Sequence, residues 1–108
     1  MPRAVMNKSL TITTVKADLF TLLSAIDPSG TPRNAVKVEI QGDVGQTANV
    51  FIGDNTLADN NFAFKLTNDS DVYSDESETK NAISLQQIFL KVVAAGANQT
   101  VHVRIRVF

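Results

Sequence analysis

Strict alternation between apolar and polar side chains is the feature that most constrains the fold of this chain. Residues 101–107 carry valine or isoleucine at every second position, and residues 35–41 repeat the pattern. Successive side chains of a β-strand point to opposite faces, so the alternation predicts two strands with one buried face each. The apolar set of these strands is Val36, Val38, Ile40, Val101, Val103, Ile105 and Val107.

Shorter apolar runs predict further strands over residues 10–15, 48–54, 62–67 and 88–93. Residues 84–87 fit a turn or a single helical turn. The leucines of residues 17–26 recur at helical spacing, but the segment is short and ends at a Pro and Gly cluster. It therefore fits either a short strand or one helical turn.

Turn-forming residues connect these runs. We expect residues 42–47 to join two paired strands, and residues 94–100 to form a second hairpin loop before the last strand. Residues 67–82 predict a long polar loop that carries five acids. These acids are Asp69, Asp71, Asp75, Glu76 and Glu78.

The strand spacing predicts an all-β fold, an antiparallel β-sandwich or jelly roll of about six to eight short strands. With 108 residues, the chain is the size of one domain. We expect residues 1–8 to be a flexible N-terminal arm and residues 9–108 to be the sandwich. The last strand needs neighbours on both sides, because otherwise it is an exposed edge.

Composition excludes several classes of function. The formal net charge is −1, so the chain lacks the basic field that nucleic-acid binding needs. No apolar run is long enough to span a bilayer, and no export signal precedes residue 9, which predicts synthesis in a cytoplasm and no membrane partner. The absence of cysteine excludes disulfides, zinc thiolates and thiol nucleophiles.

The sequence predicts no enzyme and no cofactor. His102 is the one histidine, and no G-x-S-x-G motif accompanies it. The segment that begins at Asp69 starts like a calcium loop, but Tyr73 and Ser74 stand where that motif has Asp or Asn and then Gly. The aspartates at 43, 54 and 59 lie in predicted turns, where Asp stabilises the turn itself. We therefore predict no catalytic, cofactor-binding or metal-binding residue.

A candidate interface lies on the last strand. The polar face there carries a basic row that ends in an aromatic residue, and the acidic loop offers the opposite charge. One hypothesis is that this row meets the acidic loop of another subunit, and the alternative is a solvated strand face. The interface candidates are Arg104, Arg106, Phe108, Asp71, Tyr73 and Asp75.

The order of segments over residues 22–108 resembles small virion proteins of tailed bacteriophages. In those proteins a strand of the kind V-x-I-Q is followed by N-V-(aromatic)-I-G-D, and the chain closes with an alternating valine strand. The matching segments here are Leu22–Ala25, Ala35–Gln41, Asn49–Asp54, a leucine-bearing turn at Leu85, and Val101–Ile105. The acidic stretch 69–78 is longer than the loop usual in such proteins.

The resemblance implies a structural subunit of a virion, made in the host cytoplasm. A capsid decoration or cement protein is the leading expectation, and a neck, tail or fibre-base protein is a related one. Its partners would be the major capsid protein or other virion proteins, and it would form a homo-oligomer, often a trimer. A carbohydrate-binding module for host attachment is a different class of function, for which Tyr73 and Phe62 are the aromatic candidates.

Overall fold

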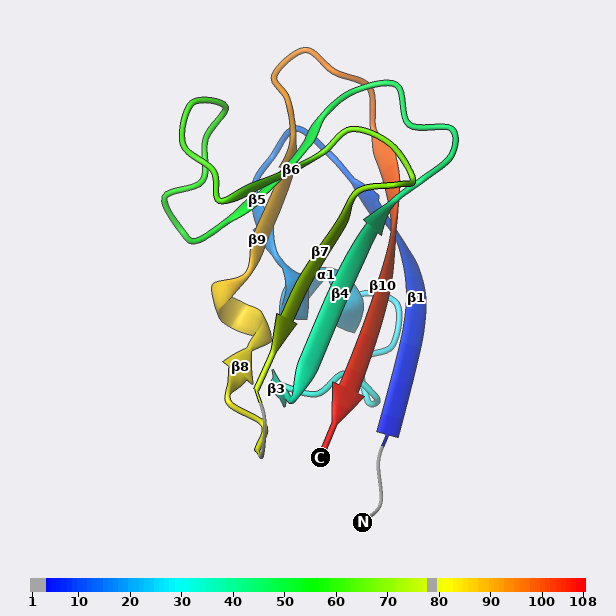
Figure 1. The fold of residues 1–108 in the computed structure, drawn as a ribbon, viewed down its shortest axis with the longest axis vertical. Coiled ribbons are helices and arrows are strands. Elements are labelled where there is room, and N and C mark those ends of the chain that lie inside the picture. Colours follow the sequence, from blue (N-terminus) through cyan, green and yellow to red (C-terminus); the bar gives the residue numbers. More distant parts are fainter. Residues whose placement is uncertain (1–3, 78–79) are drawn as a thin grey trace.

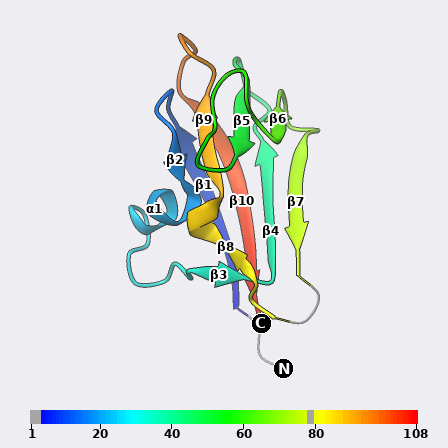
Figure 2. The same cartoon turned by 90° about the vertical axis from the view of Figure 1, so that its left-hand side faces the viewer.

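Two four-stranded antiparallel sheets pack face to face in the computed structural model, which describes residues 4–77 and 80–108 (Figures 1 and 2). Sheet A runs in the order β1 (Ala4–Ile12), β10 (Gln99–Val107), β4 (Lys37–Gly42) and β7 (Val72–Glu76). Sheet B runs in the order β2 (Ala17–Asp18), β9 (Phe89–Val92), β5 (Val50–Gly53) and β6 (Phe64–Leu66). The remaining elements are α1 (Leu19–Ser24), the 3₁₀ turn η1 (Leu85–Gln87) and a small ladder of β3 (Asn34–Ala35) with β8 (Ile83–Ser84).

The strands pair from the outside of the sequence inward. The first strand pairs with the last, β1 with β10, and the next pairs are β2 with β9, β4 with β7 and β5 with β6. This is a long antiparallel ribbon wrapped into two sheets, which is the topology of a jelly roll. The predicted all-β sandwich, with eight strands in its two main sheets over the described residues, is confirmed.

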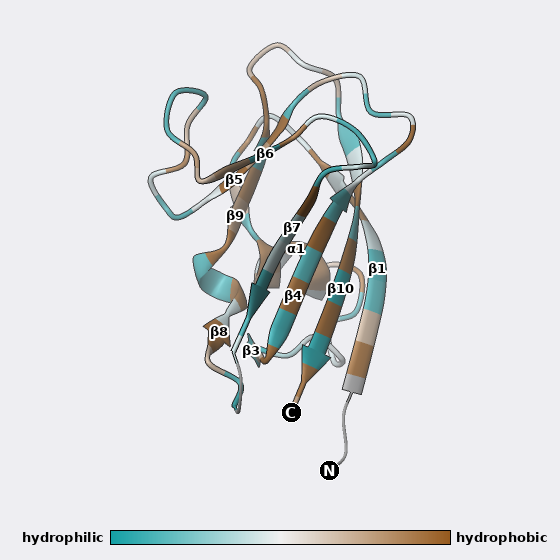
Figure 3. Cartoon of the chain, viewed as in Figure 1, coloured by the Kyte–Doolittle hydropathy of each residue, from teal (hydrophilic) through white to brown (hydrophobic). Residues whose placement is uncertain are grey.

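The core lies between the two sheets, as the alternation predicts. Along β4 and β10 every second residue is buried, and in Figure 3 these strands carry alternating brown and teal bands. Sheet B contributes the opposing wall, because Val50, Ile52, Leu90 and Val92 are all at most 1% exposed. The apolar inner faces therefore hold the sheets together.

Residues 17–26 adopt both of the predicted alternatives in succession. The short strand β2 ends at Asp18, whose carboxylate then caps α1 by accepting hydrogen bonds from the Thr21 backbone N–H at 3.0 Å and its hydroxyl at 2.7 Å. Leu19 and Leu23, one helical turn apart, are fully buried. The predicted turn before β9 is also confirmed, as η1 with Leu85 buried.

The prediction of a flexible arm over residues 1–8 is wrong for residues 4–8, which form the first half of β1. They pair with the end of β10, from Ala4 opposite Val107 to Lys8 opposite Val103. Residues 1–3 lie outside the described residues. The sequence pattern did not predict a strand here because Lys8 shares the inner face with Met6 and Leu10. A lysine at an inner position breaks the apolar alternation.

Both predicted hairpins are wrong in their pairing. Strand β4 belongs to sheet A and β5 to sheet B, so residues 43–49 cross between the sheets, and residues 93–98 cross between β9 and β10. Polar contacts hold these crossings together. The buried Gln99 side chain accepts from the Thr47 N–H at 2.9 Å and donates to the Ala97 carbonyl at 2.9 Å.

The predicted loop 67–82 contains β7, which pairs with β4 at one edge of sheet A. Its residues show no apolar alternation because only Val72 and Tyr73 are half-buried, and the other three are exposed. The last strand, β10, gains both of the neighbours it needs within the same chain, β1 and β4. It is the centre of sheet A and not an edge.

Gly42 gives a test of the packing at the end of β4. A Cβ added there would overlap the Asn68 backbone carbonyl and the Gln46 side chain. We predict that Gly42→Ala lowers the free energy of unfolding by about 1–3 kcal/mol, because the backbone of the facing loop must move. Urea denaturation measures the change, and Val44→Ala, at a side chain 83% exposed, is the control with little effect. Equal stability of the two variants would contradict the close approach.

Candidate functional site

The outer face of sheet A gathers the polar side chains of its strands. Residues directly opposite each other in a ladder share a face, so the register defines the members of this surface. They are Asn7, Ser9 and Thr11 from β1, His102, Arg104 and Arg106 from β10, Lys37, Glu39 and Gln41 from β4, and Ser74 and Glu76 from β7. The predicted grouping of His102 with the two arginines on one face is confirmed.

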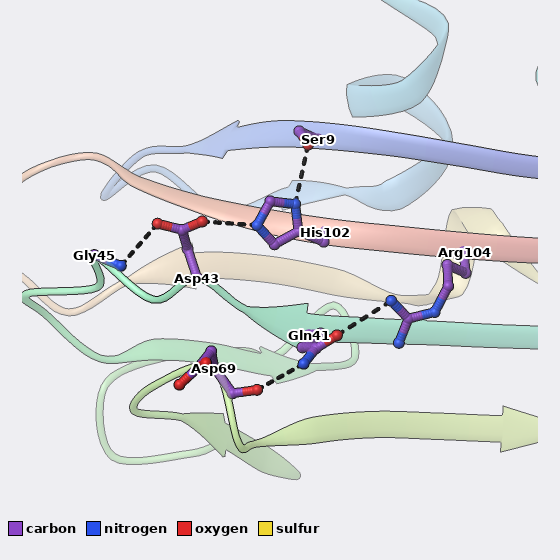
Figure 4. A network of polar contacts seen from close by, with 7 residues as sticks. All are labelled: Ser9, Gln41, Asp43, Gly45, Asp69, His102 and Arg104. Carbon is purple, nitrogen blue, oxygen red and sulfur yellow. Dashed lines mark hydrogen bonds and ion pairs between the residues drawn. The ribbon is translucent and has the colours of Figure 1, made fainter.

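A serine, a histidine and an aspartate lie in contact on this face (Figure 4). Ser9 Oγ is 3.0 Å from His102 Nδ1, and His102 Nε2 is 2.7 Å from Asp43 Oδ1. In the neutral imidazole these contacts fix the tautomer, because Nε2 must then donate to the Asp43 carboxylate and Nδ1 accepts from the serine hydroxyl. Sequence reasoning named His102 but missed both partners, since Ser9 and Asp43 lie far from it along the chain.

Asp43 is held as a carboxylate by this network. His102 lowers the pKa of Asp43 below its ordinary value of 3.8, and the Gly45 backbone N–H, 2.9 Å from Oδ2, lowers it further. The same carboxylate closes the turn that follows β4, which confirms the predicted role of Asp43 in a turn. The trio therefore ties three segments together: β1, β10 and the start of the crossing loop.

A serine that contacts a histidine, itself paired with an aspartate, is also the arrangement of serine hydrolases. Here Ser9 lies on a regular strand, where backbone N–H groups lie in the plane of the sheet and side chains stand perpendicular to it. These N–H groups therefore do not point at an oxygen above Ser9 Oγ. The neighbouring hollow of about 330 Å³ is open to solvent and is lined by residues of β1 and β10 that are all polar or charged except Val103. We interpret Ser9, His102 and Asp43 as a structural hydrogen-bond network on the sheet surface.

Arg104 already has partners within its own chain. Its Nε is 3.2 Å from Glu39 Oε1, and its Nη1 donates to Gln41 Oε1 at 3.1 Å. Gln41 in turn donates to the Asp69 carbonyl at 2.6 Å (Figure 4). This chain of contacts runs across the sheet, so the Arg104 guanidinium is engaged before any other subunit approaches.

Arg106 and Phe108 differ from Arg104. Arg106 lies opposite Lys37 on one side and Val5 on the other, and no described carboxylate lies within ion-pair distance of its guanidinium. The Phe108 side chain is 52% exposed, while its backbone N–H donates to Asn81 Oδ1 at 2.7 Å. Val5 is 66% exposed. We call Val5, Lys37, Arg106 and Phe108 the terminal patch, since they lie at the end of sheet A where β1 begins and β10 ends (Figure 1).

The acidic candidates do not share a surface with the arginines. Tyr73 lies opposite Ile40 and Asp75 opposite Val38, so both point to the inner side of sheet A at its open edge. Asp71 closes a turn, because its Oδ2 accepts from the Thr67 N–H at 2.7 Å and from the Thr67 hydroxyl, and these contacts lower its pKa. Tyr73 and Asp75 are thus separated from the terminal patch by the sheet itself, and Asp71 lies in the turn before β7.

Tyr73 borders a groove of about 630 Å³ between β7 and the segment of β8 and η1. Its ring makes an edge contact with Phe64 at 5.8 Å between centroids, and burial, with the charge of Asp75 adding to it, raises the pKa of the Tyr73 hydroxyl. Asp54, Asp75 and Gln87 also line this groove. Phe62, the other aromatic candidate, stacks on Phe51 at 4.4 Å, which covers one face of its ring.

Within residues 4–77 and 80–108, no three acidic or histidine side chains are grouped as a metal site, and no helix is long and apolar enough to cross a membrane. No family model, curated protein or solved structure matches this chain. The interpretation of the site therefore depends on the residues and their geometry.

The His102 and Asp43 contact predicts a pH-dependent contribution to stability. A carboxyl whose pKa is lowered on folding stabilises the fold above its ordinary value of 3.8, and this contribution is lost as the pH falls through the folded value. We predict that Asp43→Asn is less stable than the unmodified chain at pH 7 and that the difference shrinks as the pH falls below 3.8 and through the lowered pKa of the folded state. Denaturation at several pH values measures it.

Asp69→Asn is the matched control for this series, because the contact of Asp69 with Gln41 uses its backbone carbonyl. We expect Asp69→Asn to change stability less than Asp43→Asn at pH 7. A difference between Asp43→Asn and the unmodified chain that is constant from pH 7 to pH 2 would contradict a role for the carboxylate charge.

The geometry around Ser9 predicts that its hydroxyl is not an activated nucleophile. We expect a fluorophosphonate probe, which labels serine hydrolases covalently, to leave the folded protein unmodified in intact mass spectrometry. The control is a known serine hydrolase in the same reaction. Labelling that disappears in both Ser9→Ala and His102→Ala would establish a catalytic trio instead.

Proposed function

We propose that this chain is a non-enzymatic structural protein of a bacteriophage particle, and that it acts as a capsid decoration or cement protein. The terminal patch carries the proposal. It combines two exposed apolar side chains with Arg106, whose charge is without a carboxylate partner among the described residues. A surface of this kind fits an acidic and partly apolar surface on another protein.

The fold supports the same function. Jelly rolls occur in viral capsid proteins, although the fold alone does not imply a function. The N-V-F-I-G-D segment that carries the phage resemblance is structural here: Val50 and Ile52 are core residues, and Asp54 accepts from the Thr56 N–H at 2.9 Å to turn the chain. The resemblance therefore supports a shared scaffold, and the terminal patch supplies the proposed binding surface.

The proposed mechanism is repeated binding. The partner is the major capsid protein or another virion protein, and the chain binds it in the virion after synthesis in the host cytoplasm. Each contact is weak, but the binding free energies of many copies on one lattice add up. The sum of these contacts lets the shell resist internal pressure. No cofactor or nucleic acid takes part.

A carbohydrate-binding module for host attachment is the second candidate. The groove beside Tyr73 favours it, because an aromatic ring lies there together with carboxylates and an amide, groups that bind sugar hydroxyls by stacking and hydrogen bonds. The two candidates use opposite sides of sheet A. Variants of one surface therefore leave the other intact.

Co-sedimentation with purified capsid shells that lack this protein tests the leading proposal. We expect stoichiometric binding that weakens with added salt, and a loss of about tenfold or more in affinity for Arg106→Glu combined with Phe108→Ala. Tyr73→Ala is the matched control on the opposite face and should bind shells normally. No binding to shells by the unmodified protein, or equal losses in both variants, would contradict the proposal. Binding of the unmodified protein to a glycan panel, if Tyr73→Ala abolished it, would support the second candidate.

A further inference from the structure

The outer edge of β1 is the longest unpaired backbone edge in the described residues. Strand β1 has nine residues and pairs with β10 along its whole length. No backbone hydrogen bond joins its other side to any described residue. Figure 1 shows β1 at the border of sheet A, with no strand beyond it. An edge of this kind is a template for pairing with another chain.

The other three edges are short or charged, which are the usual protections against edge pairing. In sheet B the edge strands β2 and β6 have two and three residues. The far edge of sheet A, β7, has five residues, and its exposed part includes Asp75 and Glu76. Among these edges β1 alone combines length with an uncharged outer face, where Asn7, Ser9 and Thr11 are exposed, and its single charge, Lys8, faces the inner side.

We propose that β1 pairs edge to edge with β1 of a second copy of this chain, in an antiparallel ladder about a two-fold axis that joins two A sheets into one. A second copy is the fitting partner because it brings the same open edge, so one ladder satisfies both edges and closes. The outer side chains of β1 carry no charge, so the two copies meet there without repulsion between like charges. The inference rests on the proposed assembly function and names a contact between copies that it uses.

The charge of Lys8 restricts the register of the ladder between the two β1 strands. A two-fold axis through an antiparallel ladder places one residue directly opposite its own copy. Lys8 is the one charged residue of β1 and faces the inner side, so Lys8 opposite Lys8 would set two like charges side by side. The longest ladders that avoid this pair have a neighbour of Lys8, Asn7 or Ser9, opposite its own copy, and we place the two-fold axis at one of them. Either choice moves Lys8 opposite an apolar residue of the second copy, Met6 or Leu10.

A hollow beside the edge gives this ladder room on its inner side. The hollow has a volume of about 590 Å³ and lies between residues 5–8 of β1 and the loop of residues 27–32. Met6, Ile105 and Val107 contribute apolar walls, and Asp27 lies on its far side. In the register self-paired at Asn7, the second copy's lysine lies opposite Met6, which lines this hollow.

Cysteine cross-linking tests the proposal, because the chain has no cysteine of its own. The variants are Asn7→Cys, Ser9→Cys and Thr11→Cys on the β1 edge, with Ser74→Cys on the exposed β7 edge as the matched control. Paired positions across a ladder have Cβ atoms about 4.5–5.5 Å apart, within reach of a disulfide after small adjustments or of a short thiol cross-linker. We expect one of the two variants, Asn7→Cys or Ser9→Cys, to cross-link efficiently to its own copy. Ser74→Cys should not cross-link.

Mixed samples sharpen the test. If Ser9 is self-paired, Asn7→Cys and Thr11→Cys cross-link to each other when mixed but not separately; if Asn7 is self-paired, Val5→Cys and Ser9→Cys do so. Light scattering of the unmodified protein at about 1 mM should give the mass of a dimer or a multiple of it. A monomer or a trimer at that concentration, or equal cross-linking at Ser74→Cys, would overturn the proposal.

The result is independent of the shell-binding experiment. A protein that binds shells but fails to cross-link through β1 keeps the proposed function and loses this contact. A protein that cross-links through β1 but ignores shells keeps the contact and loses the capsid partner.

Discussion

The pairing of the first strand with the last is the interaction on which the rest of this structure depends. Strand β10 lies between β1 and β4, and its inner residues Val101, Val103 and Ile105 are at most 2% exposed. Removing it would separate β1 from the rest of sheet A and open the core along its centre. The arrangement of the outer face also depends on β10, because the two ladders of this strand determine which residues lie beside His102, Arg104 and Arg106.

The sequence predicted those parts of the fold that depend on period-two burial. Alternation in β4 and β10 identified two strands and the side of each that is buried, and the spacing of turn residues identified the sandwich. It did not predict which strands pair, because the loops after β4 and β9 have the length and composition of hairpin turns but cross between sheets. Nor did it predict β7, because an edge strand with exposed acids has no apolar period to detect.

The candidate site was predictable only in part for the same reason. Strand alternation placed Arg104 and Arg106 on one face, which the register confirms. The acids were assigned to a loop, and since β7 is a strand, the positions of Tyr73 and Asp75 follow its pleat and face the other side of the sheet. The contacts of Ser9 and Asp43 with His102 join residues from three segments, so no local sequence pattern predicts them.

The outside-to-inside pairing also sets the order in which the chain can fold during synthesis. Sheet A cannot form until residues 99–107 have left the ribosome, and before then β1 and β4 have no common neighbour. Contacts between residues so far apart in sequence carry a large loop-closure entropy and slow folding. The emerging chain therefore exposes its apolar strand faces until the last strand arrives. Folding as one cooperative event, once β10 has been synthesised, is the consequence for this protein, and its yield should be sensitive to chaperones that shield exposed strands.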